Sequence, residues 1–440
     1  MTRTWVAGNG IALFLLALLL SPAPPVAAQA AAQQEQKPAY TIAEYNAYQA
    51  ARTEKDPQAQ IKLLDDFVTK FPNSSLLPYI YQLYYPAYNQ LKNFPKVIEY
   101  VDKLLAFGDK LDAGTRLQAL YTRTLAFNYS FNEKSPTAAQ DATKAREAAL
   151  GCLKALGEIQ KPANLTDDQF NEQKKAPLAL CNYTAGYASM VSKDYKSAIE
   201  SFKAALASNP TDGVTYFRIG VAYLQEAPPE SMNGFWALAR AVALKGPGEA
   251  QVRDYLRKRL LAYQQPGCDA LIDSQMNDMI QLAGQAPTPP ANYSIPSAAD
   301  LDKVRQASNI LTVLSDLQAG GDKAKITWLT VCGSDFPEVV GKVIEVAPVA
   351  DNVGLKVFTG PTPEAMEAAT TANMDVKVEG QPEVSRLQKD DGVRFSGTLA
   401  SFDTQPFMLH WDKAKVNPED IPAEKAAPGQ HKPHKVPPKK

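Results

Sequence analysis

The chain has 440 residues, a formal net charge of −1 and 21% charged residues. This balance favours neither nucleic acid nor an anionic membrane as a partner, because both attract proteins with excess positive charge. A chain of this length is too long for one ordinary core and predicts two or three domains. Its four cysteines, Cys152, Cys181, Cys268 and Cys332, are too few for a fold built on disulfides and match no zinc-binding spacing.

The first segment, residues 1–30, has the pattern of a signal peptide. Arg3 is followed by an unbroken apolar run over residues 11–20, and small residues stand at Ala28 and Ala30. The alternative is a retained membrane anchor, but a spanning helix needs about 20 apolar residues. We therefore expect cleavage before about Ala31, a secreted or periplasmic location, and no transmembrane segment in the mature chain.

Residues 31–40 form an Ala/Gln-rich lead of low complexity, and residues 41–263 have a helical pattern. Apolar residues recur there at steps of three and four, and Gly and Pro fall mainly between the periodic runs.

An internal repeat lies in this helical region. In residues 182–210 the landmarks are Gly186, Tyr195, Ala198, Phe202, Ala205 and Pro210. Small residues at such positions let two paired helices approach closely, while the large ones fill the seam to the next pair. This spacing resembles the tetratricopeptide repeat, whose period is 34 residues. The resemblance implies a solenoid of helix pairs that binds other proteins.

A second copy follows at the same period. Tyr216, Ile219, Gly220 and Tyr223 lie 34 residues after Asn182, Ala185, Gly186 and Ser189. Residues 179–246 therefore carry the best repeats, and earlier copies are weaker. Residues 112–160 have the pattern of one stretched helix pair.

Three segments follow the repeats. Residues 264–284 are predicted to form a capping helix, residues 285–296 a Pro-rich linker, and residues 297–331 a linker helix that ends at Gly320 and Gly321.

Residues 332–416 then change to short β-branched runs between turn residues. They predict five strands with a short helix between the third and fourth, the order of an OB-like barrel. On the first strand, Val340, Ile344 and Val346 are expected to share one face, with Lys342 as a polar exception. The predicted fold class is α+β and multidomain: an α-solenoid followed by a small β-barrel. Residues 417–440, rich in Pro and Lys, are expected to be a disordered tail.

No catalytic constellation is present in the sequence, and we expect no cofactor and no metal site. Of three histidines, His410 falls on the last predicted strand, and His431 and His434 lie in the tail. Residues 336–416 contain twelve Asp/Glu and eight Lys/Arg, a net charge of −4. We therefore expect no nucleic-acid partner, because phosphate neutralisation needs the opposite sign.

The best candidate site is the groove lined by the first helices of the two clear repeats. Its residues share an apolar or aromatic stripe at helical spacing: Leu180, Tyr183, Tyr187, Met190, Val214, Phe217 and Val221. The alternative is that the C-terminal half of the chain covers this stripe. Cys152 and Cys181 would lie on neighbouring helices, so they could form one disulfide or remain buried thiols.

The favoured function is therefore an exported, non-enzymatic scaffold for protein or peptide partners. The alternative is an OB-type module that binds a polyanion or an oligosaccharide and is carried on a helical spacer. An enzyme ranks third. The sequence does not determine the oligomeric state.

Overall fold

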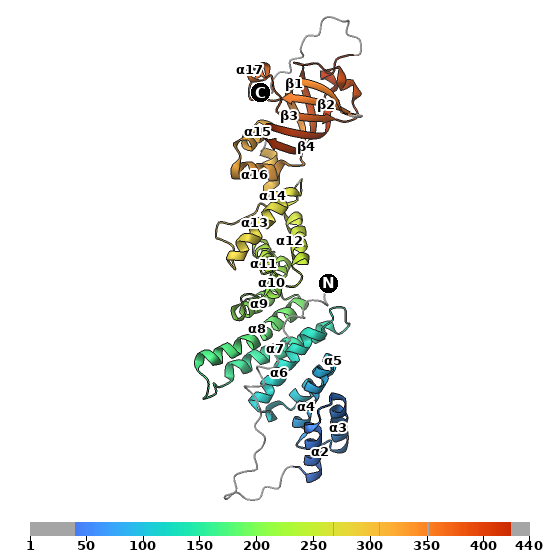
Figure 1. The fold of residues 1–440 in the computed structure, drawn as a ribbon, viewed down its shortest axis with the longest axis vertical. Coiled ribbons are helices and arrows are strands. Elements are labelled where there is room, and N and C mark those ends of the chain that lie inside the picture. The colour runs from blue at the N-terminus through green and yellow to red at the C-terminus, as the bar shows by residue number, and fades with distance from the viewer. Residues whose placement is uncertain (1–39, 267, 308, 350–351, 424–440) are drawn as a thin grey trace. The chain divides into compact units, whose positions relative to one another are not determined.

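The computed structural model describes residues 40–266, 268–307, 309–349 and 352–423 (Figure 1). The expected signal peptide and most of the lead lie outside these residues. The chain divides into two compact units. The first extends to Leu256 and includes Met279–Ala291, and the second combines Arg257–Asp278 with the residues from Asn292 onward. The predicted α+β class is confirmed: a series of helix pairs is followed by a closed barrel.

The first unit is built from consecutive helix pairs with short connections (Figure 1). The pairs are α2 (Ile42–Thr53) with α3 (Pro57–Lys70), α4 (Leu77–Gln90) with α5 (Phe94–Leu105), α6 (Ala113–Ser130) with α7 (Ala138–Glu158), α8 (Asp167–Val191) with α9 (Tyr195–Ser208), and α10 (Gly213–Gln225) with α11 (Ser231–Ala243). The 3₁₀ turn η1 (Gly108–Lys110) joins the second and third pairs. The stretched pair expected at 112–160 is the pair α6–α7.

Short polar side chains fix where these helices begin. A side-chain oxygen accepts a hydrogen bond from a first-turn backbone N–H at each of these N-caps: Asp56, Asn93, Asp112, Thr166, Asp194 and Asp212. Such bonds satisfy donors that have no partner within the helix.

Two of the hairpin turns are built in the same way. Lys92 and Lys193 adopt φ of 54° and 60°, and each precedes an N-cap, Asn93 or Asp194. The N–H of each N-cap residue donates back to a carbonyl near the end of the preceding helix, at 2.9 Å in both turns. The repeat seen in the sequence is therefore also a repeat of backbone geometry.

Glycines permit the closest helix contacts in the two clear repeats. A Cβ atom at Gly186 would lie 2.8 Å from the Phe202 ring, and one at Gly220 would lie 2.9 Å from the Leu238 side chain. The close crossings expected at both positions are present between α8 and α9 and between α10 and α11.

Two further helices contribute to both units. The helix α12 (Glu249–Gln264) passes from the first unit into the second at Arg257, and α13 (Ala270–Gln285) returns to the first at Met279. In the first unit, the Trp236 indole donates to the Ala286 carbonyl at 3.1 Å, and Arg240 donates to the carbonyls of Ala283 and Gly284 at 2.7 Å.

The prediction of a single linker helix over residues 297–331 is wrong. The structure has three helices there: α14 (Ala298–Ala307), α15 (Ile310–Ala319) and α16 (Gly321–Val331). Asn309 caps the start of α15, and Gly320, at φ 71°, ends it where the sequence predicted a stop. The chain then re-enters a helix at Gly321, because two consecutive glycines allow a sharp change of direction without a permanent break.

The barrel of the second unit has the predicted strands: β1 (Asp335–Val349), β2 (Asn352–Phe358), β3 (Met374–Val378), β4 (Gly392–Thr404) and β5 (Phe407–Val416). It closes in the order β1-β2-β3-β5-β4, and only β3 and β5 pair in parallel. The expected short helix between the third and fourth strands is η2 (Pro382–Arg386), and α17 (Pro363–Ala368) between β2 and β3 was not expected.

The prediction that Val340, Ile344 and Val346 share one face of the first strand is wrong. Val339, Gly341 and Val343 point into the barrel, whereas Val340 and Ile344 are only half-buried. A register shift between Val343 and Glu345 then turns Val346 toward the core. Adjacent valines give this strand apolar residues on both faces, and a bulge changes the alternation, so periodicity alone could not select the face.

The predicted disordered tail begins too early. Residues 417–423 are part of the fold and include the 3₁₀ turn η3 (Pro418–Asp420). The buried Asp420 carboxylate accepts a hydrogen bond from the Arg394 backbone N–H at 2.7 Å and pairs with its guanidinium at 2.8 Å. Residues 424–440 lie outside the described residues.

Candidate functional site

The predicted groove residues lie on the first helices of two consecutive hairpins. Leu180, Tyr183, Tyr187 and Met190 are on α8, and Val214, Phe217 and Val221 are on α10. We call these seven residues the α8–α10 face. Six of them are partly exposed, whereas Tyr187 is buried, with 9% of its surface exposed.

Tyr187 is held by neighbours from earlier in the chain. Its hydroxyl donates to the Glu133 carboxylate at 2.7 Å, and its ring lies edge-on against Phe131, with centroids 5.6 Å apart. Burial raises its pKa above the ordinary value of 10.0. Tyr187 is therefore part of the packing below the face, although the sequence predicted that it lines the groove.

Arg218 connects the two helices of the face. It extends from α10 so that its guanidinium lies 4.3 Å from the Tyr187 ring centroid and 5.9 Å from that of Phe217. Burial disfavours the cation, but the neighbouring oxygens of Tyr183 and Tyr187 outweigh this effect and raise its pKa above the ordinary value. The cation–π contact with Tyr187, worth about 0.5–2 kcal/mol, holds α10 against α8.

Aromatic contacts extend the face on both sides. The Tyr183 ring lies 6.2 Å from Tyr187 and 5.9 Å from Phe202 of α9, and Phe217 meets Tyr255 of α12 edge-on at 6.0 Å. Burial also raises the pKa of Tyr183, although the nearby Arg218 charge opposes this. The face is thus continuous with the aromatic packing of the hairpins.

A small cavity lies beside the start of α10. Its volume is about 220 Å³, and Val214 lines it together with residues from the ends of α9 and α11 and the start of α12. The Asp212 carboxylate at its edge already accepts from Val214 N–H at 3.0 Å and from the Thr215 hydroxyl at 2.6 Å. This carboxylate serves as a helix cap.

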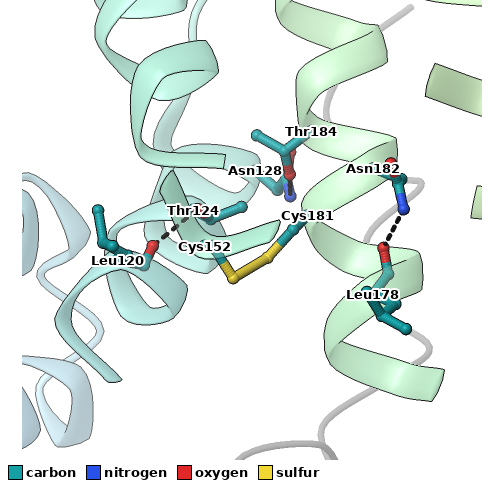
Figure 2. Close-up of a disulfide and its surroundings, with 8 residues drawn as sticks. All are labelled: Leu120, Thr124, Asn128, Cys152, Leu178, Cys181, Asn182 and Thr184. Atoms are coloured by element: carbon teal, nitrogen blue, oxygen red, sulfur yellow. Dashed lines mark hydrogen bonds between the residues drawn. A yellow bond between two sulfur atoms is a disulfide. The ribbon is translucent and has the colours of Figure 1, made fainter. Parts of the chain in front are cut away.

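A disulfide fixes α8 between Leu180 and Tyr183 of the face (Figure 2). Cys152 of α7 is bonded to Cys181, which precedes Tyr183 by two residues, and both cysteines are completely buried. Next to it the Asn128 amide of α6 donates to the Thr184 hydroxyl at 2.7 Å. The sequence left this pairing open, and the structure forms it.

Neither a metal centre nor a membrane span is found in the part of the chain that the structure describes. No three His, Cys, Asp or Glu side chains are grouped to hold a metal ion there. None of the described helices is long and apolar enough to cross a membrane. His410 lies on a strand face as predicted, where its imidazole is 2.9 Å from Asp403 and 3.5 Å from Asp375.

Sequence reasoning missed Arg218, Glu133 and Tyr255. Arg218 directly follows Phe217, so it falls outside the apolar stripe that selected the candidates. Glu133 lies in the loop after α6, 54 residues before its partner Tyr187, and no spacing rule connects the two.

The comparisons with known proteins give little beyond the fold described above. No family model and no curated protein matches the chain. Two similar solved structures are the MamA RS-1 ArsTM double mutant and the C-terminal part of a TPR repeat-containing protein from Cytophaga hutchinsonii. The first is 15% identical, with a TM-score of 0.32, and covers 48% of this chain and 95% of its own. The second is 16% identical, with a TM-score of 0.25, and covers 57% and 95%. At these scores neither likeness establishes a family.

Proposed function

We propose that this chain is an exported, non-enzymatic scaffold that binds a protein or peptide through the α8–α10 face. One observation carries the proposal. Six large apolar side chains stay partly exposed on the first helices of two adjacent hairpins, although their second helices are well packed. Apolar side chains that stay partly exposed on neighbouring helices are often used to bind partners.

The chemistry of the face favours binding over catalysis. Tyr183 and Phe217 are rigid side chains that lose little conformational entropy when a partner covers them, which suits them to binding hot spots. Burial raises the pKa of Tyr183, and Arg218 contacts its hydroxyl, so the exposed part of the ring is what the face offers a partner. The seven residues include no nucleophile paired with a general base.

The cysteines support the exported location. All four pair in the structure, Cys152 with Cys181 and Cys268 with Cys332. Disulfides persist in oxidising compartments and are rare in the reducing cytosol. This pairing agrees with the signal-peptide pattern of residues 1–30.

The test is selection of a displayed random-peptide library on the full-length oxidised protein, followed by affinity measurements on the enriched peptides. Tyr183→Ala combined with Phe217→Ala should weaken binding by at least about 2 kcal/mol, roughly thirtyfold in Kd. Tyr187 is left unchanged because its contacts with Glu133 and Arg218 make it part of the hairpin packing.

Tyr79→Ala is the matched control. Tyr79 lies on α4 and is 45% exposed, so its loss also removes an exposed aromatic ring without touching the α8–α10 face. The proposal expects Tyr79→Ala to leave peptide affinity unchanged. If both variants bind equally well, with far-UV circular dichroism intact, the partner surface lies elsewhere. Enrichment of no peptide, together with retention on glycan or polyanion resins, would favour the barrel as the binding module.

A further inference from the structure

The two disulfides differ in their access to solvent. Cys152 and Cys181 are both completely buried, whereas Cys268 is partly exposed and only its partner Cys332 is buried. An external thiol must reach a sulfur atom to exchange with a disulfide, so access sets which bridge reacts first. The sequence did not indicate the second bridge, because 64 residues separate its cysteines.

The Cys268–Cys332 bridge joins two structurally distinct segments of the second unit. Cys268 lies in the loop between α12 and α13, and Cys332 caps the C-terminal end of α16 directly before β1. The next residue, Gly333, donates to the Leu399 carbonyl of β4 at 2.7 Å. Cys332 is therefore tied to the barrel, and the disulfide fastens the α12–α13 loop to it.

Non-covalent contacts also hold the same loop. Arg305 of α14 donates to the Thr330 carbonyl at 2.7 Å and to the Gln265 carbonyl at 3.3 Å, so it bridges the same two segments. Arg257 of α12 pairs with Asp269 of the loop at 3.3 Å and with Asp273 of α13 at 2.6 Å. Exposed polar contacts of this kind are individually weak.

We propose that Cys268–Cys332 is a reversible thiol–disulfide exchange site for an external dithiol reductant, and that its reduction releases the α12–α13 loop. A thiolate of the reductant attacks the Cys268 sulfur, forms a mixed disulfide and displaces the Cys332 thiolate, which takes up a proton. The second thiol of the reductant then attacks the mixed disulfide and frees Cys268. The protein gains two electrons and two protons, and the dithiol becomes a disulfide.

The position of Cys332 favours the closed state. It lies at the C-terminal end of α16, where the helix dipole disfavours negative charge. A thiolate there is destabilised, so Cys332 is a poor leaving group and the bridge persists until a strong dithiol reductant is present. Because Cys152 and Cys181 are completely buried, reduction is expected to be selective for Cys268–Cys332.

The test uses the oxidised full-length protein and its buried bridge as an internal control. Limiting dithiothreitol is followed by alkylation of free thiols and peptide mapping by mass spectrometry. Cys268 and Cys332 should be alkylated roughly tenfold or more faster than Cys152 and Cys181, since attack requires an accessible sulfur. Equal rates, or faster labelling of Cys152 and Cys181, would overturn the assignment.

Hydrogen–deuterium exchange tests the second part of the proposal on the same samples. Selective reduction should increase deuterium uptake in residues 257–278 and leave residues 182–225 unchanged. The variant Cys268→Ser with Cys332→Ser should match the uptake of the reduced protein in 257–278. Unchanged uptake in that segment after complete reduction of the bridge contradicts the release of the loop, even if the variant fails to fold.

Discussion

Gly186 shows how one residue sets the distance between two helices. The Phe202 ring occupies the space that a side chain at position 186 would need, so α8 and α9 pack with their backbones close together. Gly220 repeats this arrangement against Leu238, one repeat later. Since interiors are close-packed, neither ring nor backbone can shift without loss of other contacts.

We therefore predict that Gly186→Leu destabilises the protein by about 1–3 kcal/mol through overpacking. Gly157→Leu is the matched control, because a Cβ at that position of α7 meets no atom within 4 Å. Thermal unfolding followed by circular dichroism measures both. A melting temperature as high for Gly186→Leu as for Gly157→Leu would show that the crossing does not depend on this glycine.

The stripe on α8 illustrates what periodicity can and cannot predict. The three- and four-residue steps placed Leu180, Tyr183, Tyr187 and Met190 on one helix, as found. They did not predict that Tyr187 is buried, because Glu133 and Phe131 approach it from the end of α6. Helical spacing gives the direction of a side chain from its own axis, while its exposure depends on residues distant in sequence.

At the scale of elements, charged N-caps make the helix pairs sensitive to acid. Asp194 accepts from the Ser197 N–H at the start of α9, and bonds to Ser197 lower its pKa below 3.8, with a smaller effect from Arg146. A carboxylate whose pKa is lower in the folded than in the unfolded state stabilises the fold at pH values above its unfolded pKa. That stabilisation is lost as the pH falls through the pKa of the folded state.

Asp194→Asn should accordingly leave stability near neutral pH almost unchanged, because Asn caps helices about as well as Asp. Between neutral pH and about pH 3, the variant should lose less stability than the parent protein. Urea unfolding at the two pH values gives the comparison, and Asp194→Ala, which costs about 1 kcal/mol at neutral pH, is the positive control. A variant that loses as much stability as the parent shows that Asp194 does not titrate in this range.

Some helices and strands were predictable from the sequence and others were not. The landmarks of the clear repeat located α9 well, since Tyr195 is its first residue and Pro210 follows two residues after its end at Ser208. The helices α14 and α15 were read as one, because the sequence between them contains no Gly or Pro. The faces of β1 were exchanged because valines on both faces and a bulge removed the alternation on which strand assignment relies.

For the barrel we predict no tight binding of single-stranded DNA or RNA at physiological salt. Residues 336–416 carry a net charge of −4, and phosphate binding requires cationic contacts. Fluorescence anisotropy with the chain ending at residue 423 avoids the Lys-rich segment beyond it. Sub-micromolar binding that weakens steeply with salt would contradict this reading of the barrel.

For the whole protein, we predict that export and disulfide pairing occur together. The mature protein should begin after Ala28 or Ala30, behind the apolar run at residues 11–20. N-terminal sequencing of protein recovered from the periplasm or the medium, with thiol alkylation of the same sample, checks both. Recovery of the chain in the cytosol with Met1 retained and four free thiols would contradict the proposed location.

The proposed function requires that the α8–α10 face is the surface that contacts a partner. Replacement of Val221 with a photo-crosslinking amino acid, in cells that express the full chain, measures this directly. The control places the same crosslinker at Leu150, which is 46% exposed on α7 and lies outside the face. We predict a specific adduct at position 221 that is absent at position 150 and is lost when Tyr183→Ala and Phe217→Ala are added. Identical adducts at both positions, or an adduct at 221 that survives the two substitutions, would contradict the account.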